Sequence, residues 1–199
     1  MANARDLRLQ SDCRHLRALA LGSGGTLAIE SVKGVPADQY VLIYRCRGIE
    51  RLEHGRPVYR DLHRVSIRLP SRYPAPIAPP RVQLLTPLYH PHVYKNLVVC
   101  MGSWQTSEFL DQFALRLGAL LQFEREYLAI QDPANEEAVE WAKKNRLLFP
   151  TDTCTFHNDP PDRTAPQDVL PAFTSLLDDV LSPAPPEEQE ESRVLWKDL

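Results

Sequence analysis

The chain has 199 residues, 43% of them hydrophobic, which is enough for one well-buried domain and short for two. Its net charge of -3 combines 11 acidic and 3 basic side chains in residues 151–199 with 15 acidic and 20 basic ones in residues 1–150. This mild basic excess forms no dense stripe of lysine and arginine, so we expect no nucleic-acid partner.

The cysteines and the hydropathy pattern favour a cytoplasmic protein. Four cysteines, at positions 13, 46, 100 and 154, form no CxxC pair and are too sparse for a disulfide framework, which favours a reducing compartment. No stretch approaches the length of a membrane span, and the first residues lack the apolar core of a signal peptide. We therefore expect a cytoplasmic location and no membrane partner.

The first part of the chain predicts an amphipathic helix that ends at the glycine-rich run 22–25. The apolar positions at helical spacing are Leu9, Cys13, Leu16 and Ala20. Arg14 and Arg17 fall on the opposite side of this helix, and Cys13 is interpreted as a core thiol. The glycine run follows a helix and precedes a strand, the reverse of a nucleotide-binding loop, so we expect no cofactor.

Strands are expected next, at residues 26–32, 39–47 and 58–69. Short turns between them indicate an antiparallel meander. A fourth short strand, at residues 81–85, is flanked by prolines, which suit the edge of a sheet because proline cannot donate to a ladder.

Two further helices are predicted after position 100. The first has Thr106 or Ser107 available as its N-cap, and its buried face consists of Leu110, Phe113, Leu117, Leu120 and Leu121. The second begins at Asn135, a good cap, with Glu136 and Glu137 at the positive end of the helix dipole.

Residues 69–100 read LPSRYPAPIAPPRVQLLTPLYHPHVYKNLVVC. This segment resembles the active-site half of ubiquitin-conjugating enzymes, in which Leu-Pro, Tyr-Pro, Pro-Pro, Thr-Pro and a His-Pro-Asn turn precede the catalytic cysteine. Cys100 follows His92 by eight residues, the family's spacing, but His92 stands where the family has asparagine. The resemblance covers roughly residues 5 to 148. It implies the α+β ubiquitin-conjugating fold: an N-terminal helix, a four-stranded antiparallel meander, the active-site segment, two C-terminal helices and a tail.

The resemblance makes Cys100 the candidate nucleophile, because thioester exchange requires a thiolate. Without the motif, a cysteine after Leu97, Val98 and Val99 is typical of a small buried residue. Cys46, expected in a strand, and Cys154, expected in a loop, are interpreted as structural.

Three other residues receive catalytic roles from the resemblance. His92 is expected to stabilise the negative oxygen of the tetrahedral intermediate, the alternative being that it only packs in the turn. His90 is expected to fix the turn by hydrogen bonding, the alternative being a part in proton transfer. Asp132, in the loop before the third helix, is expected to orient the incoming lysine, or else to be a plain turn or capping residue. Trp104 matches the family's tryptophan but follows Cys100 by only four residues, so the loop is shortened.

The partners implied are a ubiquitin-like protein, an ATP-dependent activating enzyme that contacts Arg14 and Arg17, and a target protein with an acceptor amine. A deconjugating protease is a further expected member of the pathway. The short loop, His92 and the acidic tail are most like bacterial members of the family found in antiphage operons. A non-catalytic module that binds a ubiquitin-like protein is the alternative, and the presence of Cys100 favours the enzyme.

Residues 1–149 are thus predicted to form a catalytic domain, and residues 150–199 an acidic, proline-rich extension with one amphipathic helix. A metal site is the rival chemistry for a chain that has these possible ligands: His63, His90, His92, Cys100, Cys154 and His157. Only Cys154 and His157 have a ligand-like spacing, and half a site is a weak signal, so we expect no metal.

Overall fold

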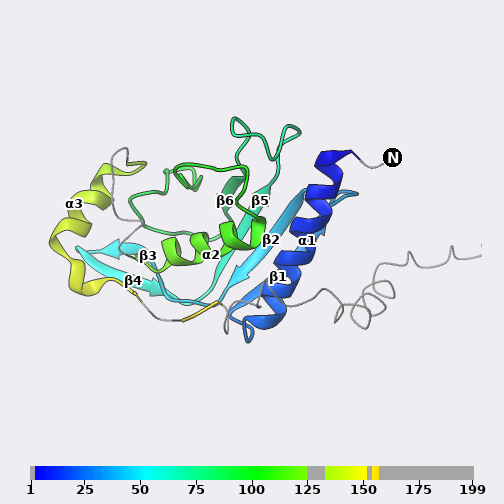
Figure 1. The fold of residues 1–199 in the computed structure, drawn as a ribbon. Helices are drawn as coiled ribbons and strands as arrows, with labels where there is room; N and C mark the ends of the chain where they lie inside the picture. Colours follow the sequence, from blue (N-terminus) through cyan, green and yellow to red (C-terminus); the bar gives the residue numbers. More distant parts are fainter. Residues whose placement is uncertain (1–2, 125–132, 152–153, 157–199) are drawn as a thin grey trace, which may run out of the picture. The chain divides into compact units, whose positions relative to one another are not determined.

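The computed structural model describes residues 3–124, 133–151 and 154–156, all within one compact unit that spans Met1–Asp159 (Figure 1). Its elements, in chain order, are α1 (Ala4–Gly22), β1 (Leu27–Lys33), β2 (Gln39–Tyr44), β3 (Gly48–Glu53), β4 (Arg56–Arg60), β5 (His63–Arg68), β6 (Arg81–Leu84), α2 (Leu110–Leu121), α3 (Glu136–Lys144) and the 3-10 turn η2 (Arg146–Leu148). None of the described helices is both long and apolar enough to cross a bilayer. The extension helix predicted from the sequence lies outside the described residues.

The strands form two antiparallel sheets. β1, β2, β5 and β6 make a four-stranded sheet in that order, and β3 pairs with β4 in a separate hairpin. The predicted edge strand is confirmed as β6, whereas the predicted strand 58–69 is two strands, β4 and β5, that belong to different sheets. Likewise, the predicted strand 39–47 ends at Tyr44.

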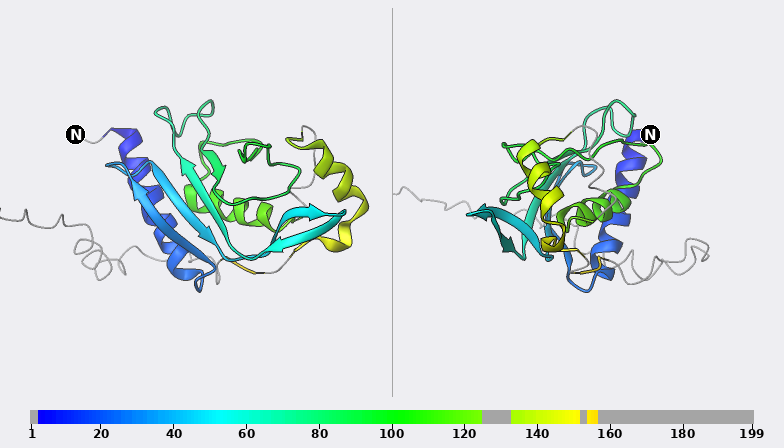
Figure 2. Two further views of the ribbon diagram at one scale, coloured as in Figure 1. Left: turned by 180° about the vertical axis from the view of Figure 1, so that it is seen from behind. Right: turned by 90° about the vertical axis from the view of Figure 1, so that its left-hand side faces the viewer.

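The chain leaves the main sheet where Gly48 passes close to His63. A Cβ atom at Gly48 would lie 2.6 Å from the His63 Nε2 atom, so only glycine permits this approach. The hairpin of β3 and β4 then extends toward α3, at the end of this unit that lies away from α1 (Figures 1 and 2). There, Ile49, Phe123, Trp141 and Ala142 form a small core of their own.

The main core lies between the sheet and the helices α1 and α2. Leu9 and Leu16 of α1 are fully buried against it, as the helical spacing predicted. α2 lies over the middle of the sheet, where Tyr44 of β2 donates a hydrogen bond to the Ala114 carbonyl at 2.9 Å. Val65 and Ile67 alternate with exposed Arg64 in β5, which confirms the predicted period of two.

The two later helices begin differently. Asn135 caps α3 as predicted, since its side chain accepts a 3.1 Å hydrogen bond from the Ala138 amide. The prediction of Thr106 or Ser107 for α2 is wrong, because Phe109 occupies the N-cap and offers no side-chain acceptor. The side chains of Gln112 and Asp12 accept from the first amides instead.

Candidate active site

Cys100 lies at the end of an irregular segment that is fastened to the edge strand β6. The amide of Leu84 donates to the Leu97 carbonyl at 2.9 Å, and the amide of Val99 donates to the Val82 carbonyl at 3.1 Å. Val99 is buried while Cys100 is half-buried. The sequence run before the cysteine therefore anchors the segment and leaves the thiol at the surface of the core.

His90 fixes the turn that precedes this segment. Its ring is fully buried, and its Nδ1 atom accepts a 3.0 Å hydrogen bond from the His92 amide. The ring also meets Phe123 edge-on, with centroids 4.4 Å apart. Burial holds the pKa of His90 well below its ordinary value, with a smaller effect of His92 in the same direction. A neutral, buried acceptor holds the turn, and its low pKa makes it a poor proton carrier near pH 7.

The main chain of His92 joins the turn to the nucleophile. Its amide donates to His90, and its carbonyl oxygen accepts a 2.8 Å hydrogen bond from the Cys100 amide. The rings of His90 and His92 lie 5.7 Å apart between centroids, and His92 is half-buried. The structure thus brings together three of the sequence-predicted site residues.

The beginning of α3 approaches the same turn. The Asn135 amide donates to the Pro91 carbonyl at 3.0 Å, which ties the loop before α3 to the segment that holds His90 and His92. Asp132, three residues before Asn135, lies outside the described residues.

Trp104 closes the short loop after Cys100. Its indole Nε1 atom donates to the Pro74 carbonyl at 3.4 Å, and its ring lies 5.5 Å from Tyr73 and 5.9 Å from Phe113 between centroids. The tryptophan therefore packs the post-cysteine loop onto the proline-rich loop that follows β5.

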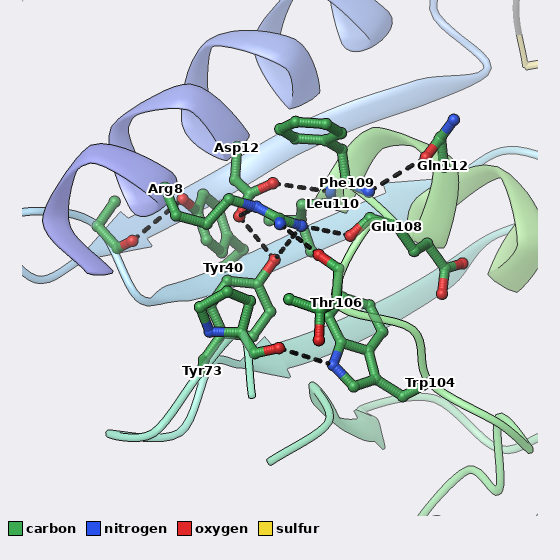
Figure 3. Close-up of polar contacts among 12 residues, drawn as sticks. Arg8, Asp12, Tyr40, Tyr73, Trp104, Thr106, Glu108, Phe109, Leu110 and Gln112 are labelled. Carbon is green, nitrogen blue, oxygen red and sulfur yellow. Dashed lines mark hydrogen bonds and ion pairs between the residues drawn. The ribbon is translucent and has the colours of Figure 1, made fainter. Parts of the chain in front are cut away.

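Sequence reasoning missed a buried polar cluster that supports this arrangement. Figure 3 shows the carboxylate of Asp12 on α1, which accepts from the Arg8 Nε atom at 3.0 Å and the Tyr73 hydroxyl at 2.6 Å. Arg8 also donates to the carbonyls of Thr106 and Glu108. The signal was present in the sequence, because Asp12 lies three residues after Leu9 and four before Leu16, on the buried face of the helix.

A family comparison decides what this framework is. The model of a family described as ubiquitin-conjugating enzyme matches residues 53–155, more than half of the 199 residues, including the turn, Cys100 and Trp104. The chain belongs to the ubiquitin-conjugating enzyme family. The α+β fold expected from the motifs is thereby confirmed, and membership implies transferase activity with a ubiquitin-like protein, an activating enzyme and a target as partners.

Individual relatives are distant. The chain is 27% identical over 111 residues to a probable ubiquitin-conjugating enzyme E2 31 of Arabidopsis thaliana, covering 54% of this chain and 68% of that one. A putative ubiquitin-conjugating enzyme from Trypanosoma cruzi has a TM-score of 0.52 at 21% identity, covering 73% of this chain and 92% of that one. The enzyme UbcA1 from Agrocybe aegerita has a TM-score of 0.45 at 18% identity, covering 60% of this chain and 83% of that one.

The other cysteines of this family member lie in packed surroundings. Cys46 is buried between β2 and β3, so its predicted place in a strand is wrong. Its thiol is hydrogen-bonded to that of Cys154, and burial raises the pKa of both. Cys13 packs partly buried against the main core. Ligand-type side chains of the described segments form no cluster of three that would hold a metal ion.

The arginines assigned to activating-enzyme contact differ in exposure. Arg14 is exposed on α1, whereas Arg17 is half-buried. Burial raises the pKa of Tyr40, and the positive charge of Arg17 acts in the opposite direction. Arg17 therefore lies on the side of α1 that faces Tyr40. Arg14 is the freer of the two for a partner.

Proposed function

We propose that the chain accepts a ubiquitin-like protein from an activating enzyme as a thioester on Cys100 and passes it to an amine of a target. The Cys100 thiolate attacks the carbonyl carbon of the donor thioester. A new carbon–sulfur bond forms, and the old one breaks as the donor thiol leaves. In the second step an amine displaces Cys100 from the same carbon. The activating enzyme supplies the energy through ATP, and no cofactor is required.

The placement of Cys100 is the observation that supports this proposal most. The residue is half-buried, directly follows the anchored Val99, and is held through its own amide by the carbonyl of His92. A partly exposed thiol in polar, irregular backbone suits nucleophilic chemistry, whereas a buried thiol does not.

His92 and Asp132 are proposed to serve the transfer step. The carbonyl of His92 accepts from the Cys100 amide, which holds this residue next to the nucleophile, and we assign to its imidazole N–H the role of donor to the oxyanion. Asp132 precedes Asn135 by three residues in the sequence, and the Asn135 amide is bonded to the Pro91 carbonyl of the turn that holds His90 and His92. We assign to the Asp132 carboxylate the role of orienting the incoming ammonium and accepting its proton.

The finer assignments complete the proposal. Arg14 and Arg17 contact the activating enzyme on α1. The protein acts in the cytoplasm, in bacterial antiphage defence, with a deconjugating protease in the same pathway. The four-residue spacing from Cys100 to Trp104, His92 in place of asparagine, and the acidic residues 151–199 support that placement. Residues 150–199 act as an extension of the catalytic domain 1–149.

Loading of a ubiquitin-like protein with purified activating enzyme and ATP tests the function. We expect an adduct that reducing agent cleaves, and a reductant-resistant ester or no adduct with Cys100→Ser. Cys13→Ala and Cys154→Ala are the controls. An adduct that persists in Cys100→Ala and is lost in either control would refute the assignment. Binding of the ubiquitin-like protein without any adduct would favour the non-catalytic module.

A further inference from the structure

The short loop after Cys100 is held by a side chain from α2. The Arg116 Nη1 atom donates to the Met101 carbonyl at 2.8 Å and to the Ser103 carbonyl at 3.2 Å. Gly102 between them has a φ of +70°, a conformation that favours glycine and turns the two carbonyls toward one donor. Met101 also packs its side chain against the main core. The backbone next to the nucleophile is therefore fixed on both sides of Gly102.

Arg116 is itself held rigidly. Its Nε and Nη2 atoms pair with the two carboxylate oxygens of Glu108, each at 2.9 Å, in a bidentate arrangement. Both side chains are largely buried, with exposed fractions of 19% for Arg116 and 17% for Glu108. The guanidinium carbon lies 5.3 Å from the centre of the Phe113 ring. A planar guanidinium with these neighbours has one orientation, which lysine does not reproduce.

Glu108 in turn is tied to α1. Its backbone carbonyl accepts from Arg8, the arginine paired with Asp12 (Figure 3). Arg116 thus connects the post-cysteine loop to the buried polar cluster. The backbone around Cys100 is therefore held by two hydrogen bonds. The Cys100 amide donates to the His92 carbonyl, and the carbonyl of the next residue, Met101, accepts from Arg116.

We propose that Arg116 is a positioning residue for Cys100. Many family members have a longer loop after the cysteine, and here the hydrogen bonds of the Arg116 side chain hold the short loop in one conformation. This inference rests on the function proposed above. The shortened loop has few residues with which to pack, so its carbonyls depend on donors from elsewhere. Since a nucleophile displaced by about 1 Å can lose about a hundredfold in rate, release of this clamp should slow the chemistry at Cys100.

The first test measures single-turnover loading of Cys100 in Arg116→Met, which keeps the length of the side chain and removes its donors. We expect the rate constant at saturating activating enzyme to fall about ten- to a hundredfold, while the half-saturating concentration stays within about twofold. Arg116→Lys, with one donor group, should fall between the parent and Arg116→Met. Arg81→Met, at an exposed arginine of β6, is the matched control and should load like the parent.

Arg116→Met leaves Glu108 without its partner, so the double variant with Glu108→Gln is measured alongside it, and thermal unfolding verifies that each variant is folded. A folded Arg116→Met or double variant that loads at the parent rate would overturn the proposal. So would a drop confined to the half-saturating concentration.

A second readout requires no partner protein. Hydrogen exchange of the Val99 and Cys100 amides, which donate to the Val82 and His92 carbonyls, should accelerate at least about tenfold in Arg116→Met and stay unchanged in Arg81→Met, because release of the adjoining Met101 and Ser103 carbonyls loosens this segment. Unchanged exchange would refute the clamp itself. If the parent does not load at all while exchange still depends on Arg116, the proposed function fails and the clamp stands as a loop-ordering contact without the positioning role. The two failures are therefore distinguishable.

Discussion

The carboxylate of Asp12, on the first helix, caps the second helix by accepting a 3.0 Å hydrogen bond from the amide of Leu110. The two residues are 98 positions apart in the sequence. The negative charge also lies at the positive end of the α2 dipole, where it is stabilising. Because its other oxygen accepts from Arg8 and Tyr73, one buried side chain joins α1, the proline-rich loop and the segment that leads from Cys100 into α2.

We expect Asp12→Ala to lower the free energy of unfolding by about 3–5 kcal/mol, since it leaves the guanidinium of Arg8 and the first amide of α2 without their buried acceptor. Asp12→Asn keeps an acceptor for Leu110 and should cost less. Urea unfolding followed by circular dichroism measures both, with Asp6→Ala, in the first turn of α1, as the matched control. A loss below about 1 kcal/mol for Asp12→Ala would contradict the role of this cluster.

Acid should destabilise the fold through His63. Burial lowers the pKa of this fully buried histidine to about 4, from an ordinary value of 6.5. Well above pH 6.5 the ring is neutral in both the folded and the unfolded chain. As the pH falls from 6.5 to 4, only the unfolded chain takes up the proton, so the free energy of unfolding decreases by up to about 3 kcal/mol.

His63→Leu should therefore lose stability less steeply than the parent over that pH range, which denaturant unfolding at several pH values measures. His54→Asn, at an exposed turn position with a φ of 50°, is the control and should keep the parent slope. Equal slopes for the parent and His63→Leu would show that His63 is not the group responsible.

Most helices and strands of the domain could be predicted from the spacing of apolar and capping residues in the sequence. α1, α2 and α3 were predicted because their apolar or capping residues recur within one turn or two, and such local signals need no knowledge of the rest of the chain. The main sheet was predicted for the same reason. The separation of β4 from β5 was not, because no glycine or proline marks the break at Asp61 and Leu62, and the two sheets are distinguished by their tertiary pairing.

The residues of the candidate site also differ in whether a local sequence signal predicts them. An ordered set of local motifs predicts Cys100, His90 and His92, which the structure brings together. The buried position of Asp12 could be read from the helical spacing, but its capping of Leu110, far along the chain, could not. Arg116 was missed because its partners in the loop are the carbonyls of Met101 and Ser103. A carbonyl leaves no trace in a sequence, so such positioning contacts become visible only when the chain is folded.

The helix α1 should govern recognition by the activating enzyme. We expect the double variant Arg14→Glu and Arg17→Glu to load Cys100 about tenfold more slowly at low salt, with a smaller difference at high salt, because positive charge on this helix steers association with acidic surfaces. Time courses of thioester loading, quenched at successive times and measured at two ionic strengths, give these rates. Arg68→Glu with Arg81→Glu, both exposed on the main sheet, is the matched charge reversal. Equal loading rates for the α1 variant and the parent at low salt would remove α1 from the interface.

Loading and transfer should be separable by mutation. Thioester formation requires a nucleophilic, accessible Cys100, whereas amide formation also requires a stabilised oxyanion and an oriented amine, which we assign to His92 and Asp132. His92→Ala and Asp132→Ala should load close to the parent rate yet discharge onto an amine about ten- to a thousandfold more slowly.

The residue type at position 92 gives the sharpest form of this prediction. His92→Asn should retain activity but flatten any change in discharge rate between about pH 6 and 8, the range in which an imidazole titrates. Single-turnover discharge of preloaded protein measures all three variants, and His54→Asn again serves as the control for loss of a histidine. The Cys100 amide is held by the His92 carbonyl rather than by its ring, so substitution of the side chain leaves this contact available. If both alanine variants discharge like the parent, Cys100 retains its role as carrier while the transfer mechanism assigned to His92 and Asp132 is wrong.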